Sequence, residues 1–284
     1  MLDPRRHPYR PDLAAAHLRE KIDSPRYVEA RDYVITAPIA PLFREPHPQA
    51  LRDTEALQGE RIAIYDINDE GWAWGQLRDD GYVGWVSDQA IDLPAHKPTH
   101  RVSALRTFSF PGPSIKLAPL ATLTLGSKLA IVRTQDNFCI DHNGIFYYSP
   151  HLASVDACEA DYVSVAERFL ETPYLWGGKS SLGIDCSGLV QTALSPCGIA
   201  APRDSDMQEA ELGNALMNSE TRHLRRGDLI FWKGHVAIAR DATTLIHANA
   251  HHLCVTIEPI EQAVSRIAMN GSEITSIKRF GTIK

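Results

Sequence analysis

The chain has 284 residues, which exceeds the roughly 100 to 200 residues of a typical single domain and predicts two or three modules. Hydrophobic residues make up 44% and charged residues 23%, as in ordinary globular proteins, and no apolar run suggests a membrane span. The formal net charge of −6 argues against nucleic acid as a partner, because proteins that bind it usually present a basic face.

Residues 1–32 are predicted to form an N-terminal extension. They contain several arginines but lack the apolar segment of a secretory signal, so we expect a cytoplasmic protein. The five cysteines of the chain have irregular spacings, which favours free thiols in a reducing compartment over a disulfide framework.

Two β-rich stretches follow, at residues 33–96 and 97–155, joined by the proline-bearing linker LPAHKPTH. In each stretch, short apolar segments are separated by Gly and Asp, which is typical of small barrels or sandwiches. GERIAI at Gly59 and GSKLAI at Gly126 share the pattern Gly-x-x-apolar-Ala-Ile at a spacing of 67 residues. This weak repeat indicates two copies of one barrel.

Residues 156–284 have a different character, with helical segments first and strands afterwards. DYVSVAERFLET and DCSGLVQTAL carry apolar residues at a helical period, and a further helix is expected at about residues 205–217. The strands DLIFW, HVAIAR and TLIHAN follow. The order predicts an α+β domain.

Cys186 is the first candidate for chemistry, because it stands at the start of the helix DCSGLVQTAL. The macrodipole and the unpaired backbone N–H groups at a helix start lower the pKa of a thiol. Asp185 is the expected N-cap, but its negative charge would raise the same pKa. The helix start therefore does not activate the cysteine by itself, and a base is needed.

Two histidines of the following strands can supply that base. If the hairpin turn consists of residues 241–243, Ala237 lies opposite His247, and His247 is diagonal to His235 on one face of the sheet. Diagonal neighbours are about 7 to 8 Å apart at the backbone, which two imidazoles can bridge. The pattern permits a relay of thiol, general base and orienting residue.

Less specific readings stay open at this point. Cys186 could be a small buried residue, and each histidine could belong to the core or the surface. His247, His251 and His252 could bind a metal, but no Glu follows His247 in the zinc-protease pattern. Cys186 and Cys197 are too far apart for a CxxC pair. The residues thus indicate no metal site and no cofactor.

Three separated segments resemble, in order and spacing, the motifs of the NlpC-type cell-wall cysteine peptidases: YLWGGKSSLGIDCSGLVQ, RRGDLIFWKGHVAIA and LIHANAHH. The resemblance covers about residue 161 to the C-terminus and implies a papain-like α+β catalytic domain. It implies that Cys186 is the nucleophile, His235 the base and His247 the orienting residue. Tyr174 matches the family's tyrosine near the nucleophile, which helps to hold substrate or oxyanion.

The first half of the chain resembles the paired bacterial SH3-like domains of the dipeptidyl-peptidase type of this family. That type cleaves γ-D-glutamyl to L-diamino-acid bonds in murein peptides. The resemblance implies that Asp185 and Ser187, together with the first barrel, capture the free amino group of an N-terminal L-Ala. The corresponding barrel residues are Asp53 and Tyr82, with Glu45 or Glu55 as alternatives to Asp53 and simple core packing as the alternative for Tyr82.

The expected reaction is attack of Cys186 on the D-Glu γ-carbonyl, protonation of the departing amine by His235, and hydrolysis of the resulting thioester. Backbone N–H groups at the helix start are the expected oxyanion donors. A cytoplasmic enzyme of this kind would act on imported murein peptides during recycling. Two other functions stay possible: a non-catalytic wall- or peptide-binding adaptor, and a thiol acyltransferase.

Overall fold

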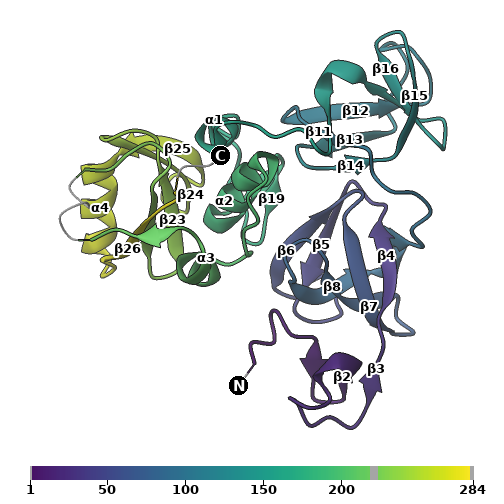
Figure 1. The fold of residues 1–284 in the computed structure, drawn as a ribbon, viewed down its shortest axis with the longest axis horizontal. Coiled ribbons are helices and arrows are strands. Elements are labelled where there is room, and N and C mark those ends of the chain that lie inside the picture. Colours follow the sequence, from purple (N-terminus) through teal and green to yellow (C-terminus); the bar gives the residue numbers. More distant parts are fainter. Residues whose placement is uncertain (1, 218–222, 282–284) are drawn as a thin grey trace. The chain divides into compact units, whose positions relative to one another are not determined.

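The computed structural model describes residues 2–217 and 223–281 and divides the chain into two compact units. The first unit extends to Ala157 and the second begins at Cys158 (Figure 1). The first contains mainly β-strands, whereas the second has helices followed by strands. The predicted division into four parts, at residues 1–32, 33–96, 97–155 and 156–284, stays a prediction.

The N-terminal extension is folded. It contains a three-stranded sheet and one 3-10 helix: β1 (Tyr9–Arg10), β2 (Leu13–Ala15), η1 (Ala16–Leu18) and β3 (Tyr27–Val28). Leu13 and Leu18 pack in one apolar cluster with Tyr65 and Trp74 of the next module. The extension therefore shares a core with the module that follows it.

The next module is a seven-stranded sheet in the order β10-β4-β7-β8-β9-β5-β6. Its elements are β4 (Arg31–Ile35), β5 (Ile39–Phe43), β6 (Arg52–Leu57), β7 (Arg61–Ile67), β8 (Trp72–Leu77), β9 (Val83–Ser87), η2 (Asp88–Ala90) and β10 (Ile91–Asp92). Arg10 lies over the rings of Trp74 and Trp85, with its guanidinium carbon 4.8 and 4.9 Å from their centroids. Over the described residues, the sheet ends at β10 and β6 and does not close into a barrel.

The second β-rich stretch forms two smaller sheets, in the orders β14-β11-β18 and β13-β12-β17-β16-β15. Their elements are β11 (His100–Val102), β12 (Arg106–Phe110), β13 (Ala121–Thr124), β14 (Lys128–Leu129), β15 (Ile131–Gln135), β16 (Phe138–Asp141), β17 (Phe146–Tyr148), η3 (Ser149–His151) and β18 (Leu152–Ser154). That this stretch is a second SH3-like barrel stays a prediction.

Gly59 and Gly126, which head the two repeated segments, both have positive φ angles, +82° and +95°. The two turns touch each other, since the N–H of Lys128 donates to the carbonyl of Gln58 at 2.7 Å. A Cβ at Gly59 would lie 2.2 Å from the carbonyl oxygen of Lys128. Glycine is therefore required at this position by both backbone conformation and space.

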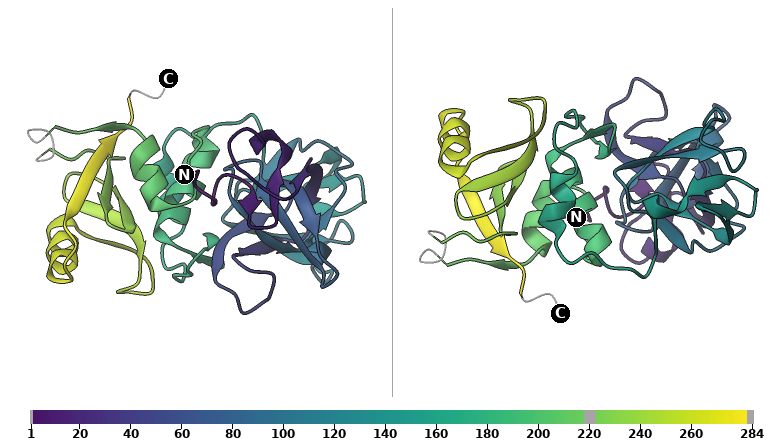
Figure 2. Two further views of the ribbon diagram at one scale, coloured as in Figure 1. Left: turned by 90° about the horizontal axis from the view of Figure 1, so that it is seen from below. Right: turned by 90° about the horizontal axis from the view of Figure 1, so that it is seen from above.

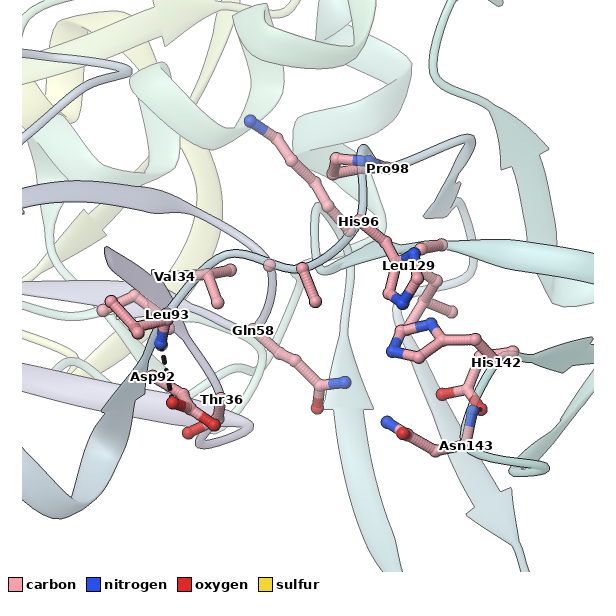
Figure 3. A pocket seen from close by; sticks show the side chains of 16 residues that line it. Val34, Thr36, Gln58, Asp92, Leu93, His96, Pro98, Leu129, His142 and Asn143 are labelled. Carbon is pink, nitrogen blue, oxygen red and sulfur yellow. Dashed lines mark hydrogen bonds between the residues drawn. The ribbon is translucent and has the colours of Figure 1, made fainter. Parts of the chain in front are cut away.

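Between these turns lies a cavity of about 410 Å³, lined by residues of both β-rich stretches (Figure 3). Figure 3 shows the rings of His96 and His142 side by side in it, and their centroids are 3.6 Å apart. The sixteen lining residues include no cysteine. Cys186 and the two histidines predicted to act with it lie in the second unit.

The second unit is an α+β domain, as predicted. Its helices are α1 (Tyr162–Glu167), α2 (Cys186–Leu194), η4 (Ser195–Cys197), α3 (Ser205–Glu211) and α4 (Ile260–Met269). Its strands are β19 (Lys179–Ser180), β20 (Gly183–Ile184), β21 (Asn214–Ala215), β22 (Leu229–Trp232), β23 (His235–Ala239), β24 (Thr244–Asn249), β25 (Cys254–Pro259) and β26 (Ile274–Arg279). Both views of Figure 2 show the sheet of the unit between α4 on one side and α1, α2 and α3 on the other.

The main sheet of this unit has the order β21-β26-β22-β23-β24-β25. On the α4 side, alternate residues such as Ala237 and Leu245 join Ala263 of α4 in one apolar cluster. On the other side, α2 packs against β23 and β24. The first turn of α2 thus lies beside the start of β23.

The prediction of one helix over residues 205–217 is wrong in its second half. The helix α3 ends at Glu211, Gly213 has a positive φ of +54°, and β21 then pairs with β26. A strand partner that is distant in sequence therefore overrides the local helical pattern.

Candidate active site

Cys186 is the first residue of α2 and is buried, with 7% of its surface exposed. The preceding Asp185 is the N-cap, as predicted: its Oδ1 accepts from the N–H of Gly188 at 2.7 Å. Its Oδ2 accepts from the N–H of Gly177 at 2.9 Å. One carboxylate thus ties the segment before the helix to the helix start.

Two glycines allow the same segment to approach α2. A Cβ at Gly188 would lie 2.2 Å from the carbonyl oxygen of Gly178, and a Cβ at Gly178 would lie 2.4 Å from that of Gly183. No Cβ tolerates such distances to backbone atoms. The motif residues WGG and CSG are therefore needed for backbone contact around Cys186.

His235 begins β23, directly after a two-residue turn in which Gly234 has a φ of +75°. Ile238 pairs with Ile246, and Ala239 with Leu245, which is the register that the predicted turn at residues 241–243 requires. The Nε2 of His235 lies 2.9 Å from the Nδ1 of His247. The two imidazoles are therefore hydrogen-bonded, as the diagonal arrangement predicts.

The thiol of Cys186 reaches β23 through the backbone, since the amide of Val236 donates to its sulfur. The amide of Ser187 donates to it as well. The paired residues of β23 and β24 end at Ile238, three residues after His235, and at Ile246, one residue before His247. The two strands are thus not paired with each other where they carry the two histidines.

Glu258 completes this chain of groups and was missed by the sequence analysis. Its Oε1 lies 2.7 Å from the Nε2 of His247 and also accepts from Arg266 of α4. Alternation along β25 could have indicated it, because Thr256 pairs with His247 and Glu258 is two residues further on the same face. The site therefore continues from the sheet to α4.

Arg203 is a second residue that the sequence analysis missed. It is 1% exposed, and its guanidinium forms two bonds to the carboxylate of Asp185, at 2.6 and 3.0 Å. It also donates to the hydroxyl of Ser187 at 2.9 Å. The negative charge that was expected to oppose the helix dipole at Cys186 is therefore paired. That Asp185 and Ser187 also contact substrate stays a prediction.

The electrostatic environment keeps both reacting groups neutral at rest. Burial, and then the charge of Asp185, raises the pKa of the Cys186 thiol to about 12, although the Val236 amide and Arg203 act in the opposite direction. Burial, His247 and Arg266 lower the pKa of His235 to about 3. A neutral imidazole is able to accept the proton of a neutral thiol during nucleophilic attack, and this role of His235 toward Cys186 stays a prediction.

Tyr174 lies on the segment that precedes Cys186. Its N–H donates to the carbonyl of Leu253 at 2.8 Å, and it forms an isolated bridge with Ile184. Burial raises the pKa of its phenol, and nearby Cys186 and Asp185 raise it further. The hydroxyl therefore stays protonated near the nucleophile, where it can donate a hydrogen bond.

Asp53 and Tyr82 lie in the first unit. Asp53 pairs with Arg44 at 2.7 Å, and Tyr82 is buried. The alternatives Glu45 and Glu55 contact His47 and Arg52, respectively. A role of these residues in substrate binding stays a prediction.

No group of three or more His, Cys, Asp or Glu side chains among residues 2–217 and 223–281 is arranged to hold a metal ion. In the same part of the chain, no helix is long and apolar enough to cross a membrane.

Comparison with known proteins agrees with this geometry. Residues 171–271 match the model of the NlpC/P60 family, and residues 42–91 match that of the bacterial dipeptidyl-peptidase Sh3 domain. The chain is 28% identical over 240 residues to the gamma-D-glutamyl-L-lysine dipeptidyl-peptidase of Bacillus cereus, which covers 73% of this chain and 70% of that protein. It is 27% identical over 238 residues to dipeptidyl-peptidase 6 of Lysinibacillus sphaericus, which covers 76% and 87%.

A crystal structure of an NlpC/P60 family protein from Bacillus cereus shares the fold, with a TM-score of 0.73 over 88% of this chain and 99% of that one, at 21% identity. An NlpC/P60 endopeptidase from Photobacterium damselae aligns with a TM-score of 0.59 over 87% and 71%, at 15% identity. Of the functions that the sequence left open, a cell-wall peptidase is the one that these relatives support. The chain is therefore a cysteine peptidase with an NlpC/P60 domain at residues 171–271 and a bacterial dipeptidyl-peptidase SH3 domain at residues 42–91.

Proposed function

We propose that the enzyme hydrolyses the γ-D-glutamyl to L-diamino-acid bond of murein-derived peptides that have a free N-terminal L-Ala, and releases L-Ala-γ-D-Glu. The observation that carries this proposal is the similarity to a gamma-D-glutamyl-L-lysine dipeptidyl-peptidase over 240 residues, 73% of the chain. The Bacillus cereus protein is named for a γ-D-glutamyl bond and for the release of dipeptides, and both features define the proposed substrate.

The relay at Cys186 is suited to this reaction. The sulfur attacks the γ-carbonyl carbon while His235 takes the thiol proton, and His235 then returns that proton to the departing amine. The products of this half-reaction are the free diamino-acid peptide and a thioester on Cys186. Water, deprotonated by the same imidazole, hydrolyses the thioester and releases the dipeptide.

Release of a dipeptide requires recognition of the chain end, and the group that marks this end is the ammonium of L-Ala. A site that pairs this ammonium rejects an acylated substrate, because its own polar groups are then buried without a partner. Asp185 and Ser187 are the residues of the catalytic domain that we predict to contact it. Arg203 holds both of them in one arrangement.

The deciding experiment compares L-Ala-γ-D-Glu-L-Lys and the meso-diaminopimelate analogue with their N-acetylated forms. We expect cleavage of both free peptides and a kcat/KM at least about 100-fold lower after acetylation. Cys186→Ala should remove activity while the protein stays folded. Equal cleavage of free and acetylated peptides would contradict recognition of the free amine. Cleavage of neither would contradict the proposal that murein-derived peptides are the substrate.

We further propose that the enzyme acts in the cytoplasm, on peptides that are being recycled. The five cysteines support this proposal, since all of them are free thiols and the thiol of Cys158 is exposed. Rapid thiol trapping in producing cells should find Cys158 reduced. Recovery of Cys158 as a mixed disulfide, or of the enzyme in the culture medium, would oppose the proposed location.

A further inference from the structure

A continuous line of polar groups links the active site to α4. The Nε2 of His235 lies 2.9 Å from the Nδ1 of His247, and the Nε2 of His247 lies 2.7 Å from the Oε1 of Glu258. The same carboxylate oxygen is bonded to the guanidinium of Arg266. The side chain of His247 is 0% exposed and that of Glu258 is 11% exposed, so water does not compete effectively for these bonds.

When the orienting residue is a histidine, the nitrogen that carries its proton is not fixed, and this tautomer matters for catalysis. A neutral imidazole has one N–H, which can be on either nitrogen. If the Nδ1 of His247 carried the proton, it would donate to the Nε2 of His235, and the proton of His235 would then be on its Nδ1. That nitrogen could no longer take the proton of Cys186. The two hydrogen-bonded imidazoles alone do not choose between these arrangements.

Glu258 makes the choice, because an ionised carboxylate only accepts hydrogen bonds. The proton of His247 must therefore be on its Nε2, and its Nδ1 must accept from the Nε2 of His235. The Nδ1 of His235 is then left with a free lone pair. We propose that Glu258, held by Arg266, is a positioning residue that sets the tautomers of both histidines and so leaves the Nδ1 of His235 as the base for Cys186.

The charges around this line of groups agree with an ionised Glu258. Burial raises the pKa of Glu258, but the hydrogen bond from His247 and the interactions with His247, Arg266 and His252 together lower it by a larger amount, so that the net change is downward. The titratable and charged groups that act on His235 are His247, Glu258 and Arg266. Arg266 comes from α4 and the others from the sheet or the loop after β24, so groups from three parts of the domain maintain the arrangement.

The tautomers can be observed directly, without any substrate. Nitrogen chemical shifts of ¹⁵N-histidine-labelled protein distinguish a protonated from an unprotonated ring nitrogen, and His235→Gln and His247→Gln identify the two residues. At pH 7 we expect protonated Nε2 and unprotonated Nδ1 in both rings. A protonated Nδ1 in either ring of the wild-type protein would overturn the proposal, whatever the variants do.

The consequence for the nucleophile is tested by the rate at which iodoacetamide alkylates Cys186, measured by peptide mass spectrometry from pH 5 to 10. In Glu258→Gln, the amide can donate as well as accept, so the tautomers are no longer fixed. We expect the rate at pH 7 to fall at least tenfold and the pH profile to move upward, because the thiol must then ionise without a base. Glu258→Asp should recover part of the rate.

The matched control is Glu261→Gln, the same chemical change three residues later at an exposed position in the first turn of α4. It should keep the wild-type rate and pH profile. A wild-type profile in Glu258→Gln would contradict the positioning role. With a cleavable peptide, we expect Glu258→Gln to lower kcat about 100-fold with little change in KM, less than the ~10⁴-fold effect of losing the correct tautomer in a serine triad, where no second imidazole intervenes.

This inference rests on the proposed catalytic roles of Cys186, His235 and His247, but it does not depend on the murein substrate. If no murein peptide is cleaved while the nitrogen shifts and alkylation rates behave as described, the substrate proposal fails and the role of Glu258 holds. If peptides are cleaved and Glu258→Gln keeps wild-type kinetics at every pH, the role of Glu258 fails and the substrate proposal holds.

Discussion

At the scale of single residues, the environment of Cys186 combines opposing influences on one sulfur atom. Burial and Asp185 favour the neutral thiol, whereas the amides of Val236 and Ser187 and the charge of Arg203 favour the thiolate. The balance lies on the side of the thiol, and burial likewise keeps His235 neutral. We therefore predict that the thiolate of Cys186 forms only when substrate binds, by transfer of a proton to His235, and is not present at rest.

Arg203 and Asp185 form a buried ion pair, so removal of one partner leaves an uncompensated charge. We expect Arg203→Met to lower the free energy of unfolding by about 3–5 kcal/mol, as found for broken buried pairs. Urea unfolding followed by circular dichroism measures this. Arg168→Met, which removes a more exposed pair with Glu159, should cost no more than about 1 kcal/mol. Equal losses of unfolding free energy in the two variants would show that the buried pair of Arg203 stabilises the fold no more than the exposed pair of Arg168 does.

The buried histidines predict how stability depends on pH. Burial lowers the pKa of His235 to about 3 and also lowers that of His247, whereas an exposed histidine has a pKa of about 6.5. Below pH 6.5 the unfolded chain therefore binds more protons than the folded one, and stability falls as the pH falls. We expect His235→Asn to remove up to about 2 kcal/mol of the loss in unfolding free energy between pH 7 and pH 5. An unchanged pH dependence would mean that His235 has the same pKa in the folded and the unfolded chain.

At the scale of elements, the site exists because three backbones meet closely. The segment with Gly177 and Gly178 touches the first turn of α2, and α2 in turn packs on β23 and β24 where these strands separate. By alternation along the strands, His235 and His247 face the α4 side with Ala237 and Leu245, whereas Cys186 starts the helix that packs on the other side of the sheet. The catalytic groups therefore come from different elements whose positions depend on one another.

This contact predicts that a side chain at Gly188 is not tolerated. Gly188→Ala would place a methyl group 2.2 Å from the carbonyl oxygen of Gly178, and neither backbone can move without disturbing Cys186. We expect a loss of about 1–3 kcal/mol of stability, as in overpacked cores, together with lower activity. The control is Gly112→Ala, where the nearest atom is the end of the flexible Leu117 side chain, at 2.9 Å. Similar thermal melting of the two variants would contradict the close approach.

At the scale of the whole molecule, the chain consists of two compact units with separate cores. The N-terminal extension belongs to the core of the first unit, since Leu13 and Leu18 are buried with Tyr65 and Trp74. The proposed catalytic groups Cys186, His235 and His247 are all in the second unit, so the proposed relay can form from that part of the chain alone.

The separate cores predict separate effects of core mutations. Leu18→Ala removes a side chain that is 1% exposed and should lower the stability of the first unit by about 2–5 kcal/mol. Hydrogen exchange followed by mass spectrometry should show faster exchange in residues up to Ala157 and little change after Cys158. Leu51→Ala, at a side chain that is 64% exposed, should change neither the stability of the first unit nor the rates of hydrogen exchange. Equal loss of protection in both units would contradict separate folding.

Local features of the site could be predicted from the sequence alone. These were the N-cap at Asp185, the helix that starts at Cys186, and the hairpin register that brings His235 and His247 together, because each depends on residues close to one another in the chain. The tertiary structure alone supplied Glu258, Arg266 and Arg203, and it ended the helix of residues 205–217 at Glu211. These features depend on charges and strands that meet only after the chain has folded. Alternation along β25 puts Glu258 on the face of His247 once the pairing of β24 with β25 is known, but it does not identify the two residues as partners.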